Sequence, residues 1–206
     1  MSGPLEGCRI VDLTSNVTGP LATMILADQG AEVIKVEMPG QGDYVRLAGN
    51  RVQGFSAAFL NNNRNKRSIA IDLKTEGGKE VLFRLVKEAD VFVQNFRPGV
   101  AERIGIGESA VRTFAPEIIY VSISGFGENG PYAKRPAYDP IIQALSGLAS
   151  IQGGADDDRP RLVRTILPDK LTAFTAAQAI TAALFAKVKT GQGQHVHLSM
   201  LDTLVS

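Results

Sequence analysis

One acidic residue stands where a helix could activate it. Asp169 follows Pro168 and precedes the alanine-rich segment 170–188, which is typical of a helix. An aspartate at this position most often caps the helix by accepting hydrogen bonds from backbone N–H groups. The same position can serve chemistry, because the positive end of the helix dipole favours an ionised carboxylate and lowers its pKa. Asp169 therefore has two interpretations, a structural cap and an ionised nucleophile.

Three clusters of basic side chains could bind an anionic ligand. They are Arg64/Lys66/Arg67, Arg97/Arg103 and Lys134/Arg135. Taken singly, each is most simply a solvated patch of surface. The second and third clusters, however, follow the expected ends of strands, which is where ligands bind in parallel α/β sheets. Two basic clusters at one sheet edge favour a polyphosphate ligand.

Two other motifs do not have the context that their usual chemistry needs. Gly125–Gly130 spells G-x-G-x-x-G after a strand, but residues 131–136 do not begin a helix whose N–H groups could hold a pyrophosphate. We therefore do not expect a dinucleotide such as NAD. His195 and His197 share one face of an expected strand, but no third ligand stands nearby in the sequence. We therefore expect no metal.

The composition excludes several classes of protein. The 206 residues carry a formal net charge of +1, which gives no general attraction to nucleic acid or to an anionic membrane. A single cysteine cannot form an internal disulfide. The N-terminus lacks a targeting pattern, and the apolar segment 171–188 is interrupted by Thr and Gln, which favours a buried helix over a membrane span. We expect a soluble, cytoplasmic protein.

The elements that must position these residues alternate along the chain. Strands are predicted at 8–13, 31–37, 68–73, 90–96, 118–124 and 194–198. Helices are predicted at 19–30, 75–87, 100–104, 109–114 and 169–188, with another beginning near 201; segments 40–66 and 151–168 are predicted to be irregular. This alternation predicts parallel βαβ units, an α/β fold with helices covering the sheet.

Eight ordered motifs together resemble one family. They are 18–20, 32–37 with 42–43, 65–69 with 72–74, 95–99, 124–127 with 130–132, 139 with 143–147, Asp169 before its helix, and 190–194 before 199–202. The chain resembles the class III coenzyme A transferases of the CaiB/BaiF type, which include formyl-CoA transferase, and the resemblance covers essentially all 206 residues.

The resemblance implies a particular architecture. Residues 1–206 would be the N-terminal portion of a CoA-transferase large domain, with a Rossmann-like parallel sheet flanked by helices. In the family, a small domain with a glycine-rich loop follows, and the chain then returns to the large domain. We expect both of these parts to be absent from this chain. Members of the family form homodimers whose two chains are interlinked like rings.

The resemblance also implies a reaction, the transfer of CoA from an acyl-CoA donor to a small carboxylic acid. The family nucleophile matches Asp169. Its carboxylate attacks the donor thioester to give an aspartyl–acyl anhydride, and the released CoA thiolate converts the anhydride into an aspartyl-CoA thioester. The acceptor carboxylate then attacks, and acyl transfer yields the new acyl-CoA. Covalent catalysis of this kind replaces one difficult step by easier ones.

Family positions that contact CoA carry over one at a time. They match Val17, Thr18, Ile71, Asp72, Leu73, Lys74, Asn95, Phe96, Arg97, Arg103, Lys134, Arg135 and Tyr138. Two positions depart from formyl-CoA transferase, which has arginine at Met38 and a glutamine of the active site at Val17. The resemblance therefore does not imply specificity for formyl-CoA and oxalate.

Two alternatives stand beside the transferase. The related α-methylacyl-CoA racemase needs a histidine in the segment that matches 136–139, where this chain has Tyr138. A phenol, with an ordinary pKa of about 10, is a poor base at neutral pH, which favours the transferase. The second alternative is an incomplete or inactive CoA-binding module, which would bind CoA without turning it over.

Overall fold

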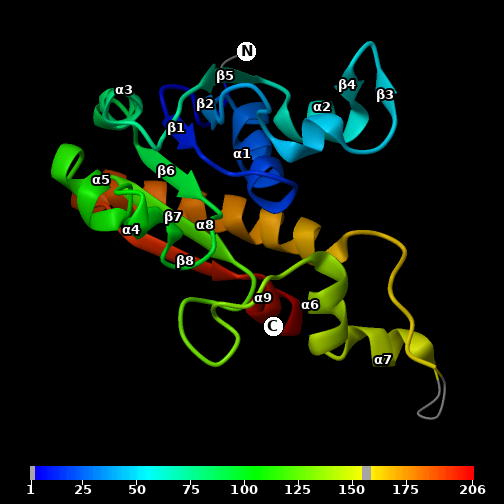
Figure 1. Cartoon of the computed structure of the whole chain (residues 1–206). Coiled ribbons are helices and arrows are strands. Elements are labelled where there is room, and N and C mark those ends of the chain that lie inside the picture. Colours follow the sequence, from blue (N-terminus) through cyan, green and yellow to red (C-terminus); the bar gives the residue numbers. More distant parts are fainter. Residues whose placement is uncertain (1–2, 155–158) are drawn as a thin grey trace.

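The computed structural model describes residues 3–154 and 159–206 (Figure 1). Its strands are β1 (Arg9–Asp12), β2 (Glu32–Glu37), β3 (Arg51–Val52), β4 (Phe55–Ser56), β5 (Lys66–Ala70), β6 (Val91–Gln94), β7 (Ile119–Ser124) and β8 (His195–Ser199). Its helices are α1 (Thr18–Asp28), η1 (Tyr44–Leu47), α2 (Ala57–Asn63), α3 (Glu76–Lys87), α4 (Val100–Arg103), α5 (Glu108–Phe114), α6 (Asp139–Leu145), α7 (Leu148–Gly153), α8 (Leu167–Thr190) and α9 (Met200–Val205).

Six parallel strands form one sheet in the order β5-β2-β1-β6-β7-β8. In order of appearance within the sheet this is 3-2-1-4-5-6, the doubly wound order of Rossmann-like folds. Ile10 on β1 lies opposite Val33 on β2 and Val91 on β6. The chain first adds β2 and β5 on one side of β1 and then adds β6, β7 and β8 on the other side. The carboxyl ends of β1 and β6 therefore form the crevice where such folds bind ligands. The predicted α/β class is confirmed.

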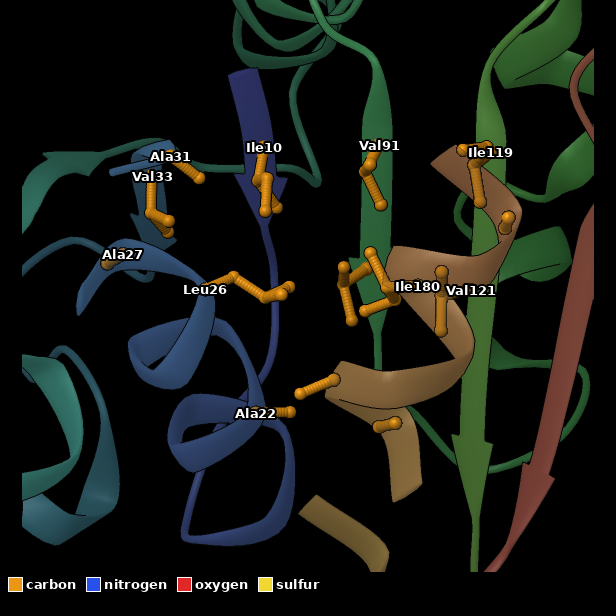
Figure 2. Packing of buried hydrophobic residues seen from close by; sticks show 14 of the residues in the cluster. Ile10, Ala22, Leu26, Ala27, Ala31, Val33, Val91, Ile119, Val121 and Ile180 are labelled. Carbon is orange, nitrogen blue, oxygen red and sulfur yellow. The ribbon is translucent and has the colours of Figure 1, made fainter. Parts of the chain in front are cut away.

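Helices cover both faces of the sheet, which explains why its central strands are apolar on both sides. On one face, α1 and α8 pack over the strands, with Leu26 and Ile180 against Ile10 and Val91 (Figure 2). On the other face, Leu82 and Val86 of α3 belong to a second buried cluster, which also contains residues of β6 and β7. These two layers hold the ends of the strands rigidly in place.

Helix α8 spans the sheet beside α1 (Figure 1). It is long and apolar enough to cross a membrane when judged by length and composition alone. Its inner face is buried and consists largely of alanine, as in Ala173, Ala176 and Ala183. Small side chains let the helix approach α1 closely, so one face of this segment packs in the protein core, as predicted, while the opposite face is exposed.

Several predicted boundaries are wrong. Strand β5 covers 66–70 instead of 68–73, because the Lys66 side chain is neutralised inside the protein and its residue can join the sheet. The segment 40–66, expected to be irregular, contains η1, the β3–β4 hairpin and α2. Two helices, α6 and α7, occupy 139–153, where none was predicted; residues 155–158 of the expected loop lie outside the described residues.

Two buried ion pairs lie beneath the carboxyl ends of β1 and β2. Lys66 Nζ donates to Asp12 Oδ2 at 3.0 Å, and also to Pro20 O and Asn63 Oδ1. Lys35 Nζ lies 3.0 Å from Asp43 Oδ2 and donates to the Thr14 carbonyl at 2.7 Å. The Lys35–Asp43 contact is an ion pair and not a hydrogen bond, because no donor among the described residues meets Asp43 Oδ2 in suitable geometry.

These pairs set the charge states of their members. Burial alone would raise the pKa of Asp12, but Lys66, Lys35 and hydrogen bonds from Thr14 and Thr23 lower the pKa to about 2. Burial lowers the pKa of Lys66 to about 8 against the attraction of Asp12. Each ion is therefore stable in the interior only while its partner is present.

We predict that Lys66→Met lowers the free energy of unfolding by about 3–5 kcal/mol, because it leaves the Asp12 carboxylate buried without its cation. Chemical denaturation measures this change. The matched control is Arg67→Met, on the same strand, whose side chain is 72% exposed and pairs with Glu32 at the surface. The control should cost at most about 1 kcal/mol.

The cost of Lys66→Met should also depend on pH. The pKa of Asp12 in the folded protein, about 2, lies below its model-peptide value. The stability that the ion pair provides is therefore complete from about pH 4 up to about pH 8, above which Lys66 loses its proton, and it is lost as the pH falls toward 2. Equal losses for the two variants, independent of pH, would contradict the proposed role of the buried pair.

Candidate active site

A cavity of about 550 Å³ opens at the carboxyl ends of the central strands. Its walls come from the loop after β1, the ends of β6 and β7, and the beginnings of α6 and α8. It is lined by Asn16, Val17, Thr18, Tyr44, Val45, Asn95, Phe96, Arg97, Pro98, Ile123, Ser124, Gly125, Ala133, Arg135, Ala137, Tyr138, Asp139, Pro140, Ile166, Asp169 and Met200. This is the position that the doubly wound topology predicts for a ligand.

Asp169 enters the cavity from the first turn of α8. The helix begins at Leu167 and its cap position is Ile166, so Asp169 is the third helical residue and the cap interpretation is wrong. Pro168 suits the first turn because the missing N–H of proline has no helical partner there. The carboxylate is consequently free to accept a hydrogen bond from another element, the Thr18 hydroxyl at the start of α1.

The expectation that the helix lowers the pKa of Asp169 is also wrong. Burial is the largest influence and raises the pKa of this carboxyl, and the nearby Asp139 carboxylate raises it further. The hydrogen bond from Thr18 opposes both, because it stabilises the ionised form. The Asp139 side chain is buried between two elements, accepting from Asp169 N at 3.3 Å and from Gln143 Nε2 at 2.6 Å.

The loop that carries Thr18 is fixed from below and from the side. Lys35 holds the Thr14 carbonyl, and Asp43 Oδ1 accepts from Asn16 N at 3.2 Å. The Asn95 amide, at the end of β6, exchanges two hydrogen bonds of 2.9 Å with the Ser15 backbone. This loop therefore connects the two buried ion pairs to Thr18, whose hydroxyl donates to Asp169.

Gly19 lets the same loop turn tightly into α1. A Cβ at this position would lie 2.3 Å from the Thr14 Cβ, so a side chain cannot fit without moving the loop. Gly125 has a similar role on the opposite wall, where a Cβ would lie 2.0 Å from that of Ala137. The segment from Gly125 to Tyr138 consists of turns and bends, as expected, and does not continue the G-x-G-x-x-G motif into a helix.

A second cavity of about 610 Å³ lies beyond the ends of β2 and β5. Its walls include the segment 71–74 with Lys74, the Arg103 side chain of α4, and the exposed Met38. Phe96 and Tyr44 line both cavities, so the two adjoin. Together they can hold a long ligand with an anionic end near Lys74 and Arg103 and a reactive end near Asp169.

The structure divides the predicted site residues between the two cavities. Val17, Thr18, Asn95, Phe96, Arg97, Arg135, Tyr138 and Asp169 line the first, and Ile71, Asp72, Leu73, Lys74, Phe96 and Arg103 line the second. Lys134 is absent from the described lining of both.

Thirteen of the 21 residues that line the first cavity were not predicted as site residues, and Asp139, Asn16 and Met200 are examples. Asp139 belongs to one of the eight motifs, and its position after Tyr138 was the one signal available. Met200 likewise had only its place in the last motif, and Asn16 gave no signal in the sequence; the loop after β1 and the start of α9 bring them to the cavity.

We predict that Thr18→Val raises the pKa of Asp169, because it removes the hydrogen bond that favours the ionised carboxylate. Titration of the Asp169 carboxyl carbon by NMR measures the shift. Thr18→Ser keeps the hydroxyl and should leave the pKa near that of the unmodified protein. An unchanged pKa in Thr18→Val would show that the hydroxyl does not stabilise the carboxylate.

Comparison with known proteins places this site in a family. Residues 5–206 match the family described as CoA-transferase family III. The chain is 42% identical over 200 residues to an acetyl-CoA:oxalate CoA-transferase of Acetobacter aceti, covering 97% of this chain and 51% of the relative. It is 43% identical over 206 residues to a human succinyl-CoA:glutarate CoA-transferase, covering 98% of this chain and 46% of the relative. The chain thus spans about half the length of these curated relatives.

Solved structures agree with the sequence comparison. Rv3272 of Mycobacterium tuberculosis superposes with a TM-score of 0.92 at 38% identity, covering 99% of this chain and 57% of that one. A CaiB/BaiF family protein of Brucella suis superposes with a TM-score of 0.93 at 38% identity, covering 100% of this chain and 55% of that one. The sequence match and the shared fold agree, and the chain belongs to CoA-transferase family III.

Proposed function

We propose that the protein transfers CoA from an acyl-CoA donor to a carboxylic acid, with Asp169 as the nucleophile. The observation that carries the proposal is the placement of the Asp169 carboxylate, held by Thr18 at the wall of a cavity that adjoins a second, basic cavity. Family membership supports the reaction class. The names of relatives support it as well, since they are CoA-transferases.

The two cavities suit the two ends of a CoA thioester. We assign the nucleotide to the second cavity, where Lys74 and Arg103 provide charge for its phosphates. The pantetheine arm would pass Phe96, which lines both cavities, and bring the thioester to Asp169. Val17 and Thr18 form the adjacent wall, at the start of α1.

The proposed reaction begins when an Asp169 carboxylate oxygen attacks the thioester carbonyl. The C–S bond breaks, the CoA thiolate leaves with the electron pair, and an aspartyl–acyl anhydride remains. The thiolate then attacks the aspartyl carbonyl, which releases the donor acid as its carboxylate and leaves an aspartyl-CoA thioester. The acceptor carboxylate then attacks the aspartyl-CoA thioester, which releases the CoA thiolate and forms a second anhydride between Asp169 and the acceptor. The thiolate attacks the acceptor's carbonyl carbon in this anhydride, which gives the new acyl-CoA and restores the Asp169 carboxylate.

The environment of Asp169 suits this chemistry. Asp169 is partly buried, which limits the access of water that would hydrolyse an anhydride or a thioester. The Thr18 hydroxyl donates to one carboxylate oxygen and leaves the other available for attack. Asp139 accepts from the Asp169 backbone N–H and so fixes the first turn of α8 against α6. The reactive oxygen is therefore held in one orientation before the substrate arrives.

We propose a dicarboxylic acid as the acceptor. Two relatives are named for the dicarboxylic acids oxalate and glutarate. Two arginines, Arg97 and Arg135, line the same cavity as Asp169. Arginine binds carboxylates through two parallel hydrogen bonds, so one guanidinium can hold the distal carboxylate while the other carboxylate reacts.

The proposed assembly is the interlinked homodimer of the family. The outer face of α8 exposes Phe174, Phe185 and Val188, and the first two line a shallow groove beside α1. A face this apolar is suited to burial against further protein.

The first test is intact-protein mass spectrometry of the protein that carries this chain, after brief exposure to acyl-CoA. A covalent CoA adduct should form, and Asp169→Ala should abolish the adduct and the transfer while CoA still binds. Asp202→Asn, at an exposed carboxylate of α9, is the control and should retain both. Adduct formation by Asp169→Ala would contradict the proposed nucleophile.

Two further measurements on the same protein test the racemase and the inactive CoA-binding module. In deuterated water, an α-methyl-branched acyl-CoA should gain no deuterium at its α-carbon without an acceptor acid. Exchange there would support the racemase. CoA binding without an adduct or turnover would support the inactive binding module.

The acceptor proposal predicts a separate effect of one arginine. Arg135→Gln should raise the KM for a dicarboxylic acceptor at least about tenfold, since a charge-assisted hydrogen bond contributes about 1.5–3 kcal/mol. The CoA adduct should still form. Lys134→Gln, one residue earlier, should leave this KM unchanged. Equal losses for mono- and dicarboxylic acceptors would contradict the assignment.

A further inference from the structure

Three potential metal ligands, two from β8 and one from the loop after β7, lie close together. His195 and His197 lie two residues apart on β8, and their ring centroids are 3.5 Å apart. Glu128, from the loop after β7, reaches them, with Oε1 3.1 Å from His197 Nδ1. One ligand atom from each residue lies within 4.8 Å of the other two. The sequence shows no third potential ligand near the histidines, and the fold brings Glu128 beside them from a distant segment.

A carboxylate behind His195 orients its ring. Glu108 Oε2 lies 2.7 Å from His195 Nδ1, and Arg112 Nε donates to the other Glu108 oxygen at 2.7 Å. A carboxylate at this distance favours the proton on Nδ1 and leaves Nε2 unprotonated, with a lone pair that can accept a bond. Metal-bound histidines usually have such a carboxylate or carbonyl partner on their second nitrogen.

The Nε2 atom faces a hydroxyl. Ser122 Oγ lies 2.9 Å away and accepts from Gln94 Nε2 at 3.0 Å, so the hydroxyl proton is directed toward His195. The sequence of contacts Ser122–His195–Glu108 has the order of a hydrolase triad. Ser122 is only 6% exposed, however, inside the sheet between β6 and β8, where an acyl substrate cannot reach it. A metal ion bound at His195 Nε2 would replace the hydrogen bond from Ser122, and the other two ligands, His197 and Glu128, are about half-exposed.

We propose that Glu128, His195 and His197 bind a divalent transition-metal ion such as Zn²⁺. Two imidazole nitrogens and one carboxylate oxygen match its ligand preference. Zinc bonds of about 2.0–2.2 Å place tetrahedral ligands roughly 3.5 Å apart, so the three ligand atoms must move closer together and His195 Nε2 must exchange its hydrogen bond with Ser122 for the metal. His197 and Glu128 are about half-exposed, which leaves the fourth position to water. The proposal does not depend on the proposed CoA transfer.

Metal binding would tie two elements together. Glu128 belongs to the segment between β7 and α6, and later residues of this segment, Ala133 and Arg135, line the cavity of Asp169. His195 and His197 lie on the edge strand of the sheet. The ion would thus fasten the cavity-lining segment to the rigid sheet.

The test is a calorimetric titration of the protein, without a histidine tag, with Zn²⁺. We expect one ion per chain, and His197→Gln and Glu128→Gln should each weaken binding at least about tenfold. Both side chains are partly exposed, so these variants should fold. Glu108→Gln, which alters only the carboxylate behind His195, should weaken binding by about 10–100-fold. Mg²⁺, which prefers oxygen ligands, should not compete.

The matched control is Glu80→Gln on α3, whose side chain is 69% exposed and pairs with Arg84. It should bind Zn²⁺ like the unmodified protein. NMR should show Zn²⁺-induced shifts of the His195 and His197 ring signals. The proposal is overturned if Zn²⁺ does not bind, or if it binds with the same affinity in His197→Gln and Glu128→Gln.

Discussion

The ion pairs beneath the carboxyl ends of β1 and β2 are the constraint on which the proposed active site depends. Asp12 pairs with Lys66, and Lys35 pairs with Asp43, all four side chains being almost fully buried. Buried charges of this kind stabilise little by themselves, but a missing partner is costly. They therefore specify one arrangement of the loop between β1 and α1.

That loop connects the buried charges to the nucleophile. Lys35 holds the Thr14 carbonyl, Asp43 holds the Asn16 N–H, and Thr18 at the loop's end donates to Asp169 from a different helix. The two helices concerned, α1 and α8, pack side by side on one face of the sheet (Figure 2). Packing sets the positions of α1 and α8. The buried ion pairs fix the loop that holds the Thr18 hydroxyl next to the Asp169 carboxylate.

The sequence predicted the parts that depend on local pattern. Apolar strands separated by helices identified the parallel sheet, and the ends of those strands indicated the edge where both cavities lie. The individual lining residues that were predicted came from the family resemblance. Non-local effects were not predictable. Lys66 looked like surface charge until β5 placed it against Asp12, and the pKa of Asp169 is raised, mainly by burial, where its place near a helix start indicated a lowered one. Glu128 joins the histidines only because β7 and β8 are neighbours.

The central claim is that Asp169 forms a covalent intermediate, and trapping with hydroxylamine tests it most directly. Hydroxylamine attacks the carbonyl of an aspartyl anhydride or thioester and leaves a stable hydroxamate on the aspartate. Peptide mapping after incubation with acyl-CoA should find the hydroxamate on Asp169, and only when acyl-CoA is present. A hydroxamate on another carboxylate, or none while transfer proceeds, would contradict the account.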